Sequence, residues 1–401
     1  MAMKFRAHDT FFIRKGWLSK GMKYVQKKPD VFVAKDENPM DVLGIGANMV
    51  KALRYWLQAV GLTEEPSSGK RVQTFTSLGN SVFTNDRYIE ELGTLYLLHY
   101  RLSSNKDEAT AWYFFFNEFN MTEFSRDDFV EFLQRRIRME EGEVSVAIRS
   151  LNDDFSCIIN TYLPRYKSNP NRIAPESNID CPFGELGLID TLSKEKKTYR
   201  KAIPLANSID PWIALAVIVD QAKGAKEISL NELLTAPCNI GKTFNLDAIS
   251  MLDVLYQVER IGKIKINRTA GLDVIHILED LTFQDCVDAY YTGINKQVTG
   301  DRTMSKMISV ASGFQYSVNI GYDLSSNEKL KNFIPTKSSL GLLEEILLST
   351  AETSTERSRV LIGAYGKGKS HIVLTILSIL MKTRLCVYLK NFSLNWKNTQ
   401  S

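Results

Sequence analysis

The chain lacks the features that mark proteins for export or for a membrane. Its five cysteines are odd in number and form no CxxC pair, so neither a disulfide framework nor a zinc knuckle is indicated. The longest apolar runs, such as residues 372–381, fall well short of the ~20 residues that a membrane span needs. The N-terminus carries Lys4, Arg6, His8 and Asp9 in place of an apolar signal core. These absences predict a cytoplasmic protein with no membrane partner and with reduced thiols.

Low-complexity tracts are also missing, and the composition is that of an ordinary globular protein, with 44% hydrophobic and 24% charged residues. At roughly 100 to 200 residues per domain, the length of the chain predicts several domains. The net charge is only +4, but residues 1–60 contain 11 Lys and Arg against 5 Asp and Glu. If nucleic acid is a partner, the N-terminal segment is where we expect it to bind.

The first segment, residues 1–90, has the outline of a winged helix. Apolar residues at helical spacing predict three helices: 17–27, 40–43 and 48–60. A strand at 71–76, a turn at Gly79-Asn80 and a second strand at Val82-Phe83 would form the hairpin. The pattern therefore predicts a winged-helix-like unit that binds DNA.

The next segment, residues 91–200, reads as a helical connecting domain. Its amphipathic pieces are 92–100, 110–119 and 127–139, and the aromatic run within 112–119 is typical of a buried core. Residues 167–180, with two prolines among Asn and Ser, are predicted to form a loop.

A second winged-helix outline lies in residues 201–285. Helices are predicted at 212–221, at 230–236 after the N-cap Ser229, and from an Asn245 cap to Arg260. Two strands, 263–267 and 273–277, follow as a hairpin. Residues 286–335 have no assignable fold. The predicted fold class is mainly α with small β hairpins (α+β): two winged-helix-like units around a helical domain, then a truncated P-loop α/β segment at 336–401.

The most specific motif is the run GAYGKGKS at residues 363–370, which matches G-x-x-x-x-G-K-[ST] between a predicted strand and a predicted helix. Its glycines, Gly363, Gly366 and Gly368, let backbone N–H groups face phosphates. Lys369 would neutralise the β and γ phosphates of ATP, and Ser370 would be a ligand of Mg²⁺.

ATP hydrolysis also needs an acidic residue on a later strand, and residues 371–401 contain no Asp or Glu. The 31 residues after Ser370 leave no room for a complete parallel sheet. We therefore expect an incomplete ATP-binding segment that does not hydrolyse ATP alone.

Candidate DNA-binding residues are the cations of the two winged-helix outlines. They are Lys51, Arg54, Lys70 and Arg71 in the first unit and Lys263, Lys265 and Arg268 in the second. The second unit also carries acidic residues on its long helix, so the first is the better candidate for DNA and the second for protein docking.

Candidate residues for a metal-dependent catalytic centre are few. They are His8, Asp9, Asp153, Asp180 and Glu185, which offer the oxygen and nitrogen groups that acid–base chemistry or a divalent metal uses. No spacing demands such a centre, and a capping or solvated role is the favoured interpretation of each residue.

Three runs carry a resemblance to a known family: residues 5–18, FRAHDTFFIRKGWL; residues 43–50, LGIGANMV, with RYWL at 54–57; and residues 180–189, DCPFGELGLI. Over residues 4–290 the chain resembles the SspB-like family of bacterial DNA phosphorothioation and phage-defence systems, once described only as a domain of unknown function. From about residue 336 it resembles the opening of the P-loop ATPases encoded beside that family. The resemblance implies a role on DNA, as in DNA nicking, within a defence complex.

Three hypotheses follow. The first is a component that binds double-stranded DNA in such a system and acts as a nicking endonuclease with a divalent metal. The second is a non-catalytic adaptor that recruits a DNA modification complex to DNA. The third is a nucleotide-dependent ATPase subunit, which would need Mg²⁺ and ATP.

Overall fold

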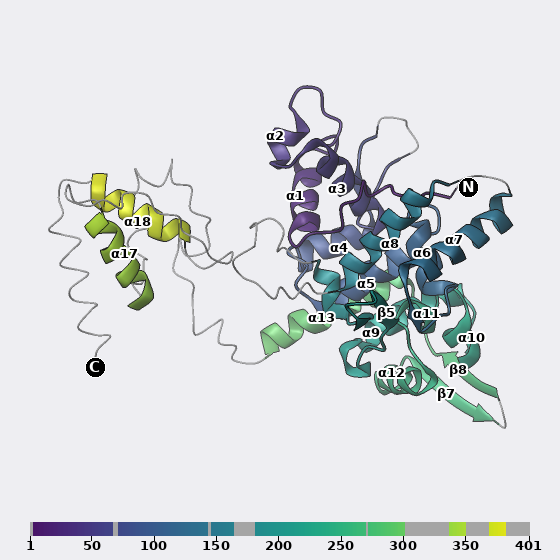
Figure 1. Ribbon diagram of the computed structural model, residues 1–401. Helices are drawn as coiled ribbons and strands as arrows, with labels where there is room; N and C mark the ends of the chain where they lie inside the picture. Colours follow the sequence, from purple (N-terminus) through teal and green to yellow (C-terminus); the bar gives the residue numbers. More distant parts are fainter. Residues whose placement is uncertain are drawn as a thin grey trace. The chain divides into compact units, whose positions relative to one another are not determined.

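The computed structural model describes residues 3–66, 71–142, 146–163, 181–269, 272–300, 337–349 and 369–381. The chain divides into two compact units, Met1–Gln297 and Val298–Ser401. Helices predominate (Figure 1), and the described strands form three small antiparallel sheets, which confirms the α+β expectation. None of the described helices is long and apolar enough to cross a lipid bilayer.

The chain begins with helices that match the predicted ones. They are α1 (Trp17–Lys27), α2 (Pro39–Leu43) and α3 (Ala47–Ala59). Helices α1 and α3 pack together closely because α1 has a glycine at the contact: a Cβ on Gly21 would lie 2.8 Å from Leu57 Cδ1. The loop between α2 and α3 turns at Gly44, whose φ of 62° favours glycine.

The hairpin predicted for residues 71–83 is wrong in its second half. Strand β2 (Thr74–Phe75) pairs with β1 (Thr63–Glu64), and Val82 and Phe83 belong to helix α4 (Ser77–Asn85). Thr76 caps this helix by accepting a hydrogen bond from Gly79 N. Gly79 serves a close contact and not a turn, since a Cβ there would lie 1.9 Å from the Leu62 carbonyl oxygen.

Four helices follow: the first three lie at the predicted pieces, and sequence reasoning did not delimit the fourth. They are α5 (Leu92–Ser104), α6 (Thr110–Asn117), α7 (Arg126–Glu141) and α8 (Ile148–Tyr162). The aromatic residues of α6 are buried except Tyr113, which is half-buried; Trp112, Phe114, Phe115 and Phe116 thus have the predicted core role. Strands β3 (Glu123–Phe124), β5 (Thr198–Lys201) and β4 (Ile189–Ser193) form a sheet in that order beside α7 and α8. The loop predicted at 167–180 lies outside the described residues.

The third part runs in the order α9 (Pro211–Ala222), β6 (Glu227–Ser229), α10 (Leu230–Thr235), α11 (Ile240–Thr243), α12 (Ala248–Arg260), β7 (Ile264–Thr269) and β8 (Leu272–Ile277). The sheet order is β6-β8-β7. Ser229 caps α10 as predicted, but Asp247, and not Asn245, caps α12. The winged-helix interpretation of this part, as of the first, remains a prediction.

Helix α13 (Phe283–Gly300) returns to α5. The Gly93 backbone N–H donates to the Tyr290 hydroxyl at 3.1 Å, and the hydroxyls of Thr94 and Tyr291 lie 2.7 Å apart. A Cβ on Gly93 would lie 2.3 Å from the Tyr290 ring, so only glycine admits this contact.

The second unit is described through two helices that pack together, α17 (Lys337–Ser349) and α18 (Lys369–Met381). Helix α18 begins at the lysine of the GAYGKGKS run, where the motif predicts a helix. Gly363, Gly366 and Gly368 lie outside the described residues, and so does the strand predicted before the motif. Nucleotide binding by Lys369 and Ser370 stays a prediction.

Candidate nucleic-acid interface

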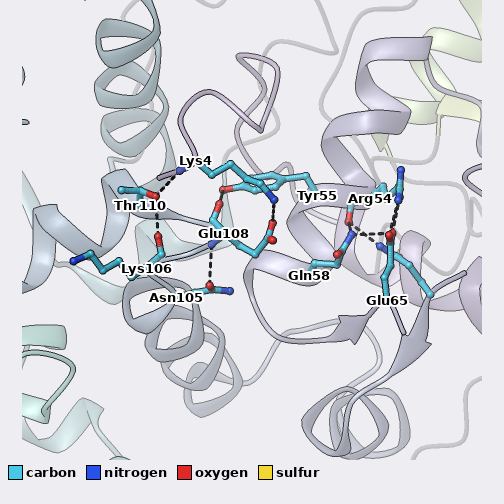
Figure 2. A network of polar contacts seen from close by, with 10 residues as sticks. Lys4, Arg54, Tyr55, Gln58, Glu65, Asn105, Lys106, Glu108 and Thr110 are labelled. Atoms are coloured by element: carbon cyan, nitrogen blue, oxygen red, sulfur yellow. Dashed lines mark hydrogen bonds and ion pairs between the residues drawn. The ribbon is translucent and has the colours of Figure 1, made fainter. Parts of the chain in front are cut away.

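The two predicted DNA contacts on α3 differ in their surroundings. Lys51 is exposed, and its ammonium group forms no ion pair with a described residue. Arg54 is held in a two-pronged ion pair: its Nε and Nη2 each lie 2.6 Å from a carboxylate oxygen of Glu65. Gln58 donates to the same carboxylate at 3.1 Å (Figure 2). Arg54 is therefore already neutralised, and Lys51 is the cation available to a phosphate.

The rest of the N-terminal excess of positive charge is also partly neutralised. Lys4 pairs with Glu108 at 2.5 Å, as Figure 2 shows, and Lys28 pairs with Asp36 at 2.5 Å. The exposed cations without an ion pair to a described residue are Lys15, Lys23, Lys27, Lys35 and Lys51. Lys23 and Lys27 lie one turn apart on α1, a helix without any acidic residue. Sequence reasoning missed these two lysines, although the absence of acids from residues 17–27 could have shown them.

The remaining predicted DNA contacts are dispersed. Arg71 is exposed just before β2, and Lys70 lies outside the described residues. In the second winged-helix outline, Lys263 pairs with Glu279 at 2.6 Å, whereas Lys265 on β7 is exposed. Arg268 lies near the end of β7, and its side chain is outside the described part.

The catalytic candidate His8 is buried and fully used in hydrogen bonds. Its Nδ1 accepts the Thr10 backbone N–H at 3.1 Å, so the proton is on Nε2, which donates to Asp154 Oδ1 at 2.7 Å. Asp154 also accepts the Arg6 backbone N–H through both carboxylate oxygens, at 3.0 and 3.1 Å. Burial raises the pKa of Asp154, and the hydrogen bond from His8 opposes that rise. This pair ties the N-terminal segment to α8, away from solvent.

The other catalytic candidates are not brought together. Asp153 lies next to the buried pair, and its Oδ2 is 2.8 Å from Arg6 Nε. Glu185 is exposed in a short 3-10 helix, Pro182–Leu186, and Asp9 is half-buried. Asp180 lies outside the described residues.

Comparison with known proteins places the first compact unit in a family. A family model described as "Protein of unknown function (DUF4007)" matches residues 5–291. The chain belongs to this family. Two solved structures resemble this DUF4007 chain, one described as an SspB crystal structure and one as magnesium ion-bound SspB. They are 26% and 27% identical, with TM-scores of 0.63, and each match covers 73% of this chain and 89% of the other. No curated protein matches. The predicted membership of an SspB-like family is confirmed.

One of these SspB structures holds magnesium, which raises the question of a metal site in this DUF4007 chain. Among the described residues, no group of three or more His, Cys, Asp and Glu side chains could hold a metal ion. Asp153 faces the Arg6 guanidinium and Asp154 faces His8, so both carboxylates near α8 are already engaged. Asp153 and Asp154 are therefore not free to form an all-protein site for a divalent metal.

Proposed function

We propose that this protein is the DNA-binding component of a bacterial DNA phosphorothioation and anti-phage defence system. The observation that carries the proposal is the similarity to SspB, which extends over 89% of that chain at 27% identity. The unpaired lysines of the N-terminal part support it, because phosphate contacts by Lys and Arg supply most of the affinity of non-specific DNA binding. The other proteins of the modification complex are the proposed protein partners.

The proposal is tested by titrating a fluorescent DNA duplex with the full chain across a series of salt concentrations. We expect the logarithm of the binding constant to fall linearly with the logarithm of the salt concentration, since each phosphate contact releases counterions. Binding that is absent at low salt, or that does not change with salt, would contradict the proposal.

Charge variants on α3 refine this test. Lys51→Gln is expected to weaken binding about 5-fold near 0.15 M salt and to lower the salt slope by about 0.9, the value for one phosphate contact. Arg54→Gln is the matched control: its guanidinium is already neutralised by Glu65, so its removal should change the slope less. An equal effect of both variants would show that the Arg54–Glu65 ion pair opens when DNA binds. No effect of Lys51→Gln would show that DNA binds elsewhere than on α3.

A supercoiled-plasmid assay with Mg²⁺ or Mn²⁺ separates a nicking enzyme from an adaptor. Relaxed circles would favour nicking, and retained binding without relaxed circles would favour the adaptor. One observation is in line with the adaptor alternative: α12 exposes two apolar side chains, Ile249 at 73% and Tyr256 at 39%, and a protein partner could cover them. A Lys369-dependent ATP-binding signal would test the third alternative, the nucleotide-dependent subunit.

A further inference from the structure

A groove lies between α7, α8 and the β4–β5 hairpin, and none of its lining residues is a predicted catalytic or DNA-binding residue. It consists of two adjoining hollows of about 380 and 240 Å³, which share Ile159, Asn160, Lys197 and Tyr199 as lining residues. One wall is the C-terminal half of α8 and the other is the hairpin. The groove is therefore elongated and lies on the surface of the first compact unit.

The charge of the groove comes mostly from the hairpin turn. Lys194, Lys196 and Lys197 line it, are exposed, and form no ion pair within the part of the chain that the structure describes. Arg126 at the start of α7 adds a fourth cation. The single carboxylate in the lining, Asp127, lies 3.6 Å from Arg126. The three hairpin lysines thus form no ion pair with a described residue, although Glu195 lies between Lys194 and Lys196 in the same turn.

The hairpin turn is built to hold its lysines in place. The Lys196 backbone N–H donates to the Ser193 hydroxyl at 3.2 Å, and the register between β4 and β5 shifts at Thr191 and Ser193. Lys197 has a left-handed backbone with a φ of 52°. A turn fixed in this way presents the ammonium groups at less entropic cost than a free loop.

Neutral donors line the floor of the groove. The Tyr199 ring is held 5.9 Å from Phe155 and 6.1 Å from Phe124. Burial raises the pKa of Tyr199, so its hydroxyl keeps the proton and can donate. Asn160 on α8 adds an amide, whereas the Ser156 hydroxyl already donates to the Asn152 carbonyl oxygen at 2.8 Å and can only accept from a ligand. Such groups commonly contact the oxygens of a nucleic-acid backbone.

We propose that this groove binds the phosphate backbone of a DNA strand, with the three hairpin lysines as its cations and Tyr199 and Asn160 as neutral donors. The inference rests on the proposed function and names a surface for it. The elongated shape and the row of unpaired cations favour an extended polyanion over a single phosphate group.

The test compares two triple variants of the full chain in the duplex titration. Lys194→Gln/Lys196→Gln/Lys197→Gln removes three charges from the groove. It is expected to weaken binding roughly 100-fold near 0.15 M salt and to lower the salt slope by about 2.7. The control, Arg135→Gln/Arg138→Gln/Arg149→Gln, removes three exposed charges from α7 and α8 that line neither hollow. Its slope should stay near the wild-type value.

A second variant tests the neutral donors. Tyr199→Phe keeps the ring contacts and removes only the hydroxyl, so we expect a several-fold weaker affinity with an unchanged salt slope. If the lysine variant binds DNA with the affinity and salt slope of the wild type, the groove does not bind DNA, but the proposed function still stands. Equal losses in both triple variants would overturn it as well, because net charge would then be the cause. Absent binding by the wild-type chain would instead contradict the proposed function.

Discussion

Replacing His99 is expected to remove part of the acid sensitivity of the first compact unit. The side chain is fully buried on α5, with Nε2 2.7 Å from the Thr243 carbonyl oxygen and Nδ1 2.7 Å from the Tyr162 hydroxyl. Since a carbonyl only accepts, Nε2 carries the proton, and Nδ1 accepts from the tyrosine. The neutral ring is thus satisfied on both sides. Burial lowers the pKa of His99 from 6.5 to about 4.

The sign of the pH effect follows from the two states. In the unfolded chain His99 takes up a proton as the pH falls through 6.5, whereas the folded chain resists protonation down to about 4. The contribution of neutral His99 to the free energy of unfolding is therefore fully present above pH 6.5 and is lost progressively as the pH falls below that value. Between pH 7 and pH 5 the loss amounts to about 2 kcal/mol of unfolding free energy.

The assay is urea unfolding of the full chain at both pH values, followed by the fluorescence of its buried tryptophans. His99→Gln can still donate to Thr243 and accept from Tyr162 but does not titrate, so its pH-dependent loss should be smaller than that of the wild type by about 2 kcal/mol. Other titrating groups contribute equally to both proteins and cancel in the comparison. The same loss in both would refute this account of His99.

Two further stability predictions rest on single contacts. Lys201→Met keeps the aliphatic stem but removes the Nζ that donates to the carbonyl oxygens of Phe115 and Phe119, at 2.6 and 2.5 Å. We expect the free energy of unfolding in urea to fall by about 2 kcal/mol, and an unchanged unfolding midpoint would contradict this. Gly79→Ala would place a Cβ 1.9 Å from the Leu62 carbonyl oxygen, so α4 must move. We expect the free energy of unfolding to fall by about 3 kcal/mol, and a thermal unfolding temperature equal to that of the wild type would contradict the close contact.

Much of the fold could be predicted from local patterns. The helix at residues 17–27 has the predicted bounds, and the hairpin of β7 and β8 lies where two alternating runs flank a turn. The error at Val82 and Phe83 arose because a Gly-Asn pair signals a turn locally. In the folded chain, position 79 requires glycine because the Leu62 carbonyl oxygen, 17 residues earlier in the chain, leaves no room for a Cβ. Local sequence cannot distinguish these two reasons for a glycine.

The candidate site was less predictable because charge in a sequence does not show which charges are paired. Arg54 and Lys51 look equivalent along a helix, yet Glu65 from the following loop neutralises only Arg54. His8 and Asp154 are 146 residues apart, and no spacing announces their contact. The lysines at 194–197 could have been read as a basic hairpin turn. Their position opposite Asn160 on α8 depends on tertiary packing.

The return of α13 to α5 has a consequence for how the chain is made. Gly93 and Tyr290 meet although 197 residues separate them. At roughly 5–20 residues per second, about 10 to 40 seconds pass on the ribosome between the synthesis of one partner and that of the other. During that interval the surface of α5 around Gly93 and Thr94, which receives Tyr290 and Tyr291, stays open. Contacts of such long sequence separation also slow folding, so the first unit closes only after nearly all of it has left the ribosome.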